Sequence, residues 1–222
     1  MKVVITSATE REVIQIKQSL DPSFTKPARI PVHFHESGVG MLSSCFSISK
    51  LIFEQRPDLI IQAGIAGSFN NKIPLGNVVA VRDEIAGDIG VEENGSFKDL
   101  FDLNLQHPDL FPFNERRLVN TSFDALNYLK LPAVTGLTVN EITTRPARIE
   151  ALKIRYQPAI ESMEGASLHY CCLQTGTQFL QMRSISNYVG ERDKSKWNFK
   201  AAFHNLTKTI LAYIEQLQRR HM

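Results

Sequence analysis

The chain has 222 residues, of which 43% are hydrophobic, and its 25 basic side chains nearly balance 23 acidic ones. This length and composition predict a single domain, residues 1–222, with a sizeable buried core. A net charge of +2 provides no broad basic field, so a small molecule is favoured over nucleic acid as the partner. Three cysteines without paired spacing indicate reduced thiols and a cytoplasmic protein. The sequence shows no pattern typical of a signal peptide or a membrane span.

Short apolar runs bounded by glycine, proline and polar residues predict strands at 3–6, 32–35, 59–63, 78–81, 133–139 and 179–182. Apolar residues at helical spacing predict helices at 10–20, 41–55, 121–130, 163–174 and 197–217. This alternation predicts an α/β fold with a mostly parallel or mixed central β-sheet covered by helices on both faces. Functional groups are then expected at the carboxyl ends of strands.

Residues 93–117 follow neither the strand period nor the helix period, and they contain four phenylalanines. A long irregular segment in a compact domain often serves as a lid or as a wall of a binding site. We therefore expect an ordered excursion from the domain at about 93–117.

The first candidate site is SATERE, residues 7–12, directly after the first predicted strand. Thr9 and Glu12 have the spacing of a helix capping box, which gives Glu12 a purely structural interpretation. A partly desolvated carboxylate at a strand end is also suited to take a proton from water as a general base. Both interpretations remain open on local grounds.

Two glycine-containing stretches follow. ESGVGMLSS, at 36–44, approaches the dinucleotide fingerprint, but Asp58 precedes the next strand, whereas the acidic residue of that motif ends it. In PDLIIQAGIAGSF, at 57–69, Ala66 and Gly67 end a buried strand. Small residues there allow backbone groups to approach a flat ligand, or allow close packing of a helix on the sheet.

The last two candidate stretches are AIESMEGASLHYCC, at 159–172, and RSISNYVGERD, at 183–193. A carboxylate in the first turn of a helix commonly complements the helix dipole. At a strand end, however, Glu164 is able to accept two hydrogen bonds from a vicinal diol, as in a ribose. The second stretch places Ser186, Asn187 and Asp193 after the last predicted strand.

Taken in this order, Glu12 after the first strand, SGVG, PDLIIQAGIAGSF, the Met163-Glu164 pair and RSISN resemble the nucleoside phosphorylase and nucleosidase superfamily. The resemblance is strongest to methylthioadenosine/S-adenosylhomocysteine nucleosidases, and it spans nearly the whole chain. It implies a nucleoside phosphorylase-like fold and a homodimer or larger homo-oligomer. A purine nucleoside is the expected small-molecule partner, and no cofactor is expected. Six scattered histidines give no metal-ligand spacing.

The resemblance also implies roles for individual residues. Glu12 would activate the attacking water, Met163 and Glu164 would hold the ribose, and backbone around Ala66 and Gly67 would line the site. Cleavage of a ribosyl bond passes through a cation-like sugar, which Glu164 would stabilise.

The residue at position 187 departs from the adenine-specific nucleosidases, which have an aspartate there. Asn187 offers an amide N–H to O6 of a 6-oxopurine and a carbonyl oxygen to its protonated N7, while an ionised aspartate serves only N7. An asparagine followed by YVGERD is similar to the futalosine hydrolases, which release hypoxanthine from a menaquinone-pathway intermediate. This resemblance implies hydrolysis of the N-ribosidic bond of futalosine. Ser186 and Asp193 are expected beside Asn187 at the base.

The substrate of those enzymes carries a carboxyphenyl ketone on the ribose 5′ carbon. Its carboxylate needs a cation, and four loop arginines are available: Arg145, the first candidate, and Arg116, Arg117 and Arg192. The phenylalanine-rich excursion is expected to supply an aromatic wall for the ring. No residue of VNEITTR, 139–145, matches the aromatic side chain that stacks on the base in adenine-specific relatives.

Several alternatives stay open. The enzyme is also predicted, as a second choice, to be a nucleosidase or phosphorylase for inosine, methylthioadenosine or S-adenosylhomocysteine. Residues 36–46 and 63–70 contain no arginine or lysine, which favours water over phosphate as the nucleophile. A ligand-binding module without turnover is disfavoured by the pair Glu12 and Glu164, since ribose binding does not need the first. A nicotinamide enzyme is disfavoured by the position of Asp58.

Overall fold

The structure is a computed structural model that describes residues 1–20 and 30–220. Its strands are β1 (Val3–Ser7), β2 (Val32–Glu36), β3 (Leu59–Ser68), β4 (Val78–Ala86), β5 (Gly90–Glu93), β6 (Ser96–Asp99), β7 (Leu118–Val119), β8 (Ala133–Thr138), β9 (Ile160–Ser162) and β10 (Gln178–Tyr188). Its helices are α1 (Ile14–Ser19), α2 (Met41–Gln55), α3 (Phe123–Leu126), α4 (Pro146–Tyr156), α5 (Gly165–Thr175) and α6 (Phe199–Arg220), with short 3-10 turns η1 (Glu10–Glu12) and η2 (Lys194–Lys196).

The central sheet is mixed, and it closes on itself. β3 pairs with β1 and β10 in parallel and with β9 antiparallel, while β10 also pairs with β4, β4 with β8, and β8 with β9. The strands β3, β10, β4, β8 and β9 therefore form a closed, barrel-like ring, from which β1 and β2 extend. The expectation of a mixed α/β sheet is confirmed. The sheet is not a simple open one, because five of its strands form a closed ring.

The closure follows from the length of β3 and β10, which extend well beyond the short apolar runs 59–63 and 179–182. The first half of β3 pairs with β1, while its last residues, Gly67 and Ser68, pair with β9. Each long strand thus has different neighbours along its length, and the sheet must curl between them.

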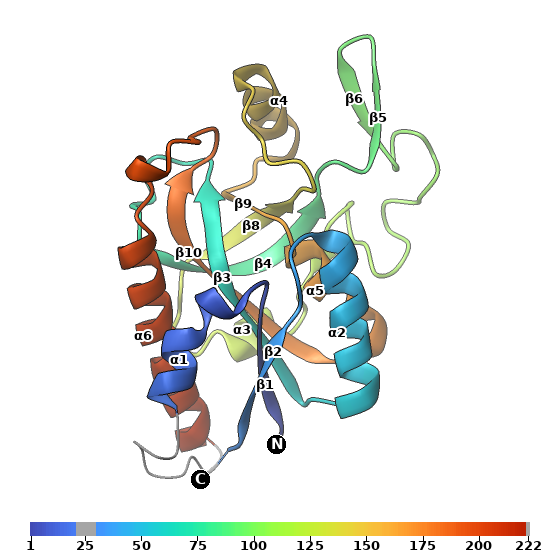
Figure 1. The fold of residues 1–222 in the computed structure, drawn as a ribbon. Helices are drawn as coiled ribbons and strands as arrows, with labels where there is room; N and C mark the ends of the chain where they lie inside the picture. The colour runs from blue at the N-terminus through green and yellow to red at the C-terminus, as the bar shows by residue number, and fades with distance from the viewer. Residues whose placement is uncertain (21–29, 221–222) are drawn as a thin grey trace.

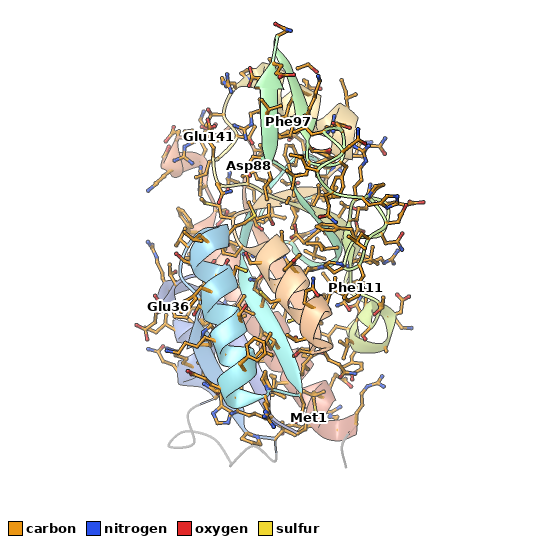
Figure 2. All side chains as sticks on the ribbon, turned by 90° about the vertical axis from the view of Figure 1, so that its right-hand side faces the viewer. Met1, Glu36, Asp88, Phe97, Phe111 and Glu141 are labelled. Atoms are coloured by element: carbon orange, nitrogen blue, oxygen red, sulfur yellow. The ribbon has the colours of Figure 1, made fainter. Side chains whose placement is uncertain are left out.

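Helices do cover both faces where the sheet is open, in β2, β1 and β3. Val3 and Ile5 of β1 pack on the side of α1 and α6, and Val4 packs on the side of α2 and α5. This alternation is the period-2 pattern of a strand buried on both faces. Figure 1 shows α1 and α6 on one side of β3 and α2 on the other, and Figure 2 looks onto α2 with α5 beside it.

All of the strands predicted from apolar runs are present, and several elements were missed. Helix α4 was not predicted, because PARIEALKIRY presents mostly charged or exposed positions and buries only Leu152 and Tyr156. Of the helix expected at 121–130, only Phe123–Leu126 is helical. No helix within residues 1–20 and 30–220 combines the length and the hydropathy needed to cross a bilayer.

The excursion at 93–117 begins in the β5–β6 hairpin and continues through turns to β7. Asp99, which is 3% exposed, accepts hydrogen bonds from Arg116 and from Arg155 of α4 and so ties the excursion to that helix. Phe97 lies on the hairpin and Phe111 on a separate turn lower on the molecule (Figure 2). Ion pairs of Asp99 with Arg116 and Arg155 therefore hold the excursion against α4.

Candidate active site

A cavity of about 390 Å³ lies where η1, β3, β9, β10 and the start of α6 meet. Seven of the residues predicted from the sequence line it together: Glu12, Ala66, Gly67, Met163, Glu164, Ser186 and Asn187. They come from segments far apart in the chain, and the closed ring of strands brings them to one place. The cavity is a site of the size that binds small molecules.

The carboxylate of Glu12 joins η1 to the central strand. One oxygen accepts hydrogen bonds from the backbone N–H groups of Ala8 (3.0 Å) and Thr9 (3.2 Å), and the other from the N–H of Ile65 (3.1 Å). The contact with Thr9 has the form of the capping box expected from the sequence. Glu12 also lines the cavity, so its role in the capping box does not remove it from the site. Burial raises the pKa of Glu12, against the opposing charge of Arg183.

Arg183 is the main residue of this site that the sequence analysis did not assign. It lies on β10, is 1% exposed, and donates to the side-chain oxygen of Gln62 at 2.9 Å. One guanidinium nitrogen lies 3.6 Å from a carboxylate oxygen of Glu164. A buried guanidinium needs such partners, because an uncompensated buried charge is strongly destabilising. The only sequence signal was a charged residue directly after the apolar run FLQM.

Gly64 makes room for this arrangement. A Cβ added to Gly64 would lie 2.4 Å from the Nη1 of Arg183 and 2.9 Å from a carboxylate oxygen of Glu12. Since real Cβ atoms do not approach other atoms so closely, any side chain at position 64 must push the two charged groups away. Within AGIAG, Gly64 therefore accommodates the two charged groups, while Ala66 and Gly67 line the cavity.

Glu164 precedes α5 as its N-cap residue, and it is 5% exposed. Its carboxylate accepts a hydrogen bond from the backbone N–H of Gly40 at 3.1 Å. Gly40 has a φ of 86°, a left-handed conformation that glycine adopts freely. The glycine turn at 36–44, which approaches the dinucleotide fingerprint in sequence, thus donates to a carboxylate of the chain itself.

The start of α5 is fixed from inside the ring of strands. The N–H of Ala166 donates to the Thr138 hydroxyl at 2.8 Å, and that hydroxyl donates to Glu84 at 2.9 Å. Gly165 leaves space for this chain, because a Cβ there would lie 2.0 Å from Glu84. Burial raises the pKa of Glu84 to about 7. These contacts hold the backbone that carries Met163 and Glu164.

Ser186 and Asn187 both line the cavity although they are consecutive in β10. Consecutive strand residues normally face opposite sides, but the pairing of β10 with β3 shifts register between Ile185 and Asn187. The Ser186 hydroxyl donates to the Oδ1 of Asn187 (2.8 Å), and the Nδ2 of Asn187 donates to the Tyr188 carbonyl (3.0 Å). Because a carbonyl only accepts, this contact fixes the amide orientation.

An aromatic wall is supplied by the segment after β10. Trp197, Phe199 and Phe203 line the cavity, the last two lying one helical turn apart at the start of α6. The guanidinium of Arg11 lies 5.7 Å from the ring centre of Phe199 and 5.9 Å from that of Phe203. Arg11 also lines the cavity and is exposed. None of these residues was assigned from the sequence, because only the fold brings α6 next to η1.

Two predicted site residues are placed elsewhere. Asp193 is exposed, and its carboxylate accepts from the N–H and hydroxyl of Ser195, as the N-cap of η2. Arg145 is exposed and lines a different cavity, beside Asp88, Glu141 and Arg148. Neither lines the cavity that holds Asn187. Local spacing could not reveal this, since each residue follows a predicted strand, at whose end functional groups were expected.

The other residues that were expected to bind the 5′ substituent do not line this cavity either. Arg116 pairs with Asp99 and Asp102, and Arg117 pairs with Asp83. Arg192 lies 5.8 Å from the ring centre of Trp197. No part of the excursion at 93–117 is among the residues that line this cavity. Two of its phenylalanines, Phe101 and Phe113, make an edge contact with each other, and Phe113 also contacts Tyr170 of α5.

The closed ring of strands and a small-molecule cavity lined by three buried carboxylates, Glu12, Glu161 and Glu164, are features of an enzyme that acts on a small molecule. The family model of the phosphorylase superfamily matches residues 2–219, and the chain belongs to this superfamily. The resemblance inferred from the sequence is therefore confirmed.

Individual relatives agree with this assignment. The chain is 27% identical to the futalosine hydrolase of Thermus thermophilus, over 79% of this chain and 77% of that protein. It is 26% identical to the 5'-methylthioadenosine/S-adenosylhomocysteine nucleosidase of Bacillus velezensis, over 98% of this chain and all of that protein. The structure of the Helicobacter pylori futalosine hydrolase shares the fold, with a TM-score of 0.78 at 18% identity, covering 97% and 98% of the two chains. The prediction of an enzyme, an N-glycosyl hydrolase, is confirmed.

Proposed function

We propose that the chain hydrolyses the N-ribosidic bond of futalosine, releasing hypoxanthine and dehypoxanthine futalosine, a step of menaquinone biosynthesis. The observation that carries the proposal is the amide of Asn187, which is 8% exposed and lines the cavity. Ser186 and Tyr188 use one acceptor position and one N–H of this amide. One N–H and one lone pair remain for a ligand.

This remaining donor and acceptor match a 6-oxopurine. The free N–H suits O6, and the free lone pair of Oδ1 suits N7–H in the departing base. Adenine presents an amino group where hypoxanthine has O6, so the amide N–H would face a donor. A mismatched buried polar group costs on the order of 1–3 kcal/mol, which is sufficient to set the base preference.

The mechanism assigned to the site is attack of water on C1′. Glu12, whose pKa is raised by burial, would take the proton from the attacking water. Glu164 would accept hydrogen bonds from the ribose hydroxyls and stabilise the cation-like sugar, with Met163 beside it. Asn187 would stabilise the N7-protonated base as it leaves. Arg183 orients Glu164 through their contact at 3.6 Å.

The 5′ substituent of futalosine combines an aromatic ring with a carboxylate. In this chain, Phe199 and Phe203 offer apolar surface in the same cavity, and Arg11 lies over both rings. Arginine pairs well with carboxylates through its planar, multiply donating group. We therefore transfer the carboxylate-binding role from Arg145, which lines another cavity, to Arg11.

Water is the proposed nucleophile. Among the residues that line the cavity, Arg11 is the one cation, and it stands at the aromatic wall. A phosphate co-substrate would need clustered cationic or backbone donors near the ribose. Glu12 and Glu164 at this place favour a neutral nucleophile over an anion.

The test is to offer futalosine, inosine and methylthioadenosine without phosphate and to identify the free base by chromatography. Hypoxanthine from futalosine, formed at a rate independent of phosphate, is the expected result. Release of adenine from methylthioadenosine in preference would support the second candidate, a methylthioadenosine/S-adenosylhomocysteine nucleosidase, which the end-to-end similarity to the Bacillus velezensis protein keeps open. A rate that rises with added phosphate would contradict hydrolysis.

A further inference from the structure

A buried polar cluster lies behind the cavity, where Glu84 of β4, Gln181 of β10 and His169 of α5 meet, each of them fully buried. The Nε2 of Gln181 donates to one oxygen of Glu84 at 2.8 Å, and the Nδ1 of His169 lies 2.8 Å from the Leu118 carbonyl oxygen. Two atoms of the cluster, Oε1 of Gln181 and Nε2 of His169, have no hydrogen-bond partner within residues 1–20 and 30–220. Unpartnered buried polar atoms are costly, so an arrangement of protons that satisfies both atoms is favoured.

The tautomer of His169 follows from its contact with Leu118. A carbonyl only accepts, so Nδ1 carries a proton, and a neutral ring then has a lone pair on Nε2. Burial lowers the pKa of His169 to about 4, so the ring is uncharged at neutral pH. The Nε2 of the ring therefore needs a donor, and the side chain of Gln181 is close enough to influence that pKa.

Gln181 supplies this donor when its amide is reversed. The two orientations of an amide have the same shape, so the pattern of hydrogen bonds decides between them. With the NH2 group toward His169, the amide oxygen faces Glu84 in place of the nitrogen. An amide oxygen only accepts, so the facing oxygen of Glu84 must carry a proton. The other oxygen of Glu84 still accepts from the Thr138 hydroxyl at 2.9 Å.

We propose that Glu84 is a positioning residue that acts as a neutral carboxylic acid: its O–H donates to Oε1 of Gln181, whose NH2 group donates to Nε2 of His169. Both atoms that otherwise lack a partner then have one. The proton state of Glu84 is inferred from these contacts alone, whereas its effect on turnover rests on the proposed function.

The charged groups around Glu84 fit a neutral acid. Burial raises the pKa of Glu84 to about 7, and Asp83 on the same strand adds to the rise, whereas the charge of Arg183 on β10 opposes it. Asp83 is itself paired with Arg117. Glu84 is therefore expected to keep its proton up to about neutral pH and to release it above that.

The proton matters for the reaction because Arg183 also serves two carboxylates of the proposed mechanism. Its guanidinium lies 3.6 Å from Glu164, and it lowers the pKa of Glu12, which burial raises. An ionised Glu84 would be a third carboxylate that attracts the same guanidinium. A neutral Glu84 leaves Arg183 to Glu164 and Glu12, and so positions it for the reaction.

The competing arrangement is an ion pair bridged by Gln181. A protonated His169 would donate from Nε2 to the amide oxygen, and an ionised Glu84 would accept from the NH2 group. Every atom then has a partner as well, but two charges lie in a fully buried cluster. Burial opposes both charges, since it lowers the pKa of His169 and raises that of Glu84.

Glu84→Gln separates the two arrangements, because glutamine reproduces a neutral acid: its NH2 group donates to Gln181 and its oxygen accepts from Thr138. Infrared difference spectra between wild type and this variant detect the C=O stretch of a protonated carboxyl group. At a pH between 4.5, the ordinary pKa of a glutamate, and about 7, wild type should show one such band that the variant lacks. The band should vanish as the pH is raised further. Glu150→Gln is the control, since Glu150 is exposed on α4 and pairs with Lys153, so its removal should take away no band.

Turnover at varied pH gives the second readout. Ionisation of Glu84 should draw Arg183 away from Glu164, so wild-type kcat should fall about tenfold as the pH rises through about 7, and the fall should be absent in Glu84→Gln. A purely structural role would change kcat of the variant by the same factor at every pH.

Three results would overturn the inference. These are the absence of the carboxyl band from wild type, an alkaline fall in kcat that is missing in wild type or persists in Glu84→Gln, and a Glu84→Gln protein that circular dichroism shows to be unfolded below pH 7. The last result would mean that the charge of Glu84 is required. Failure of the proposed function is seen separately, as absence of hypoxanthine release from futalosine, and the infrared band needs no substrate.

Discussion

Asn187→Asp is expected to reverse the base preference. In the variant an oxygen replaces Nδ2, which in the wild-type site donates to the Tyr188 carbonyl at 3.0 Å and whose second N–H is the proposed donor to O6. Loss of the contact with Tyr188 affects every substrate equally, so it cancels in a ratio of two substrates. Loss of the donor for O6 affects only the 6-oxopurine.

The size of the change follows from this one contact. A missing partner for a buried polar group costs about 1–3 kcal/mol, so the ratio of kcat/KM for inosine to that for adenosine should fall about 5- to 150-fold at neutral pH. The carboxylate also accepts from the amino group of adenine, which moves the ratio further in the same direction. At acid pH the protonated carboxyl regains a donor, and the ratio should partly recover.

The assay is the release of hypoxanthine and adenine from equimolar inosine and adenosine, separated by chromatography at several pH values. Measuring both bases in one reaction removes errors in the active concentration of the variant. An unchanged ratio at neutral pH would refute the assignment of Asn187 as a reader of O6.

The remaining predictions concern the carboxylates, the 5′ group and the glycine behind them. Glu12→Gln and Glu164→Gln should each lower kcat about a hundredfold or more without unfolding the protein, and near-wild-type turnover would contradict their roles. Because burial raises the pKa of Glu12 above 4.5, and a base acts only when ionised, wild-type kcat/KM should fall as the pH is lowered through that raised pKa. Arg11→Met should raise KM for futalosine about tenfold and leave inosine unaffected, with Arg145→Met as the matched control. A raised KM in Arg145→Met, with Arg11→Met unchanged, would return the role to Arg145. Gly64→Ala should displace the buried guanidinium, and so lower the midpoint of thermal unfolding, measured by calorimetry, and reduce kcat. A variant with wild-type stability and activity would contradict this, since it would show that the contacts at position 64 adjust freely.

A local sequence pattern placed each cavity residue that was found from the sequence at the end of a strand or the start of a helix. Glu12 follows the first strand at capping-box spacing, and Glu164 precedes a helix. Ser186 and Asn187 follow an apolar run, although the register shift that turns both toward the cavity has no visible local signal. Strand ends converge in a sheet, so position along the chain was informative for these residues.

The residues that were missed depend on contacts between distant segments. Arg183 and Glu12 meet because β10 and η1 both contact β3, and Arg11 meets Phe199 because α6 returns beside η1. Closure of the ring likewise depends on β3 pairing with β10 and β9 along different parts of its length. Periodicity describes each strand separately, and it contains no information on which strands become neighbours.

The charges at the centre of the site explain why a buried arginine is compatible with a cation-like transition state. A guanidinium alone would repel the developing positive charge on the sugar. Arg183, however, lies 3.6 Å from a carboxylate oxygen of Glu164, and its charge lowers the pKa of Glu12, so nearby carboxylates offset the charge of the guanidinium. In the proposed reaction the carboxylates face the sugar cation, and Glu12 takes the proton of the attacking water. By lowering the pKa of Glu12, against the rise that burial causes, Arg183 favours the ionised carboxylate that the proposed proton transfer needs.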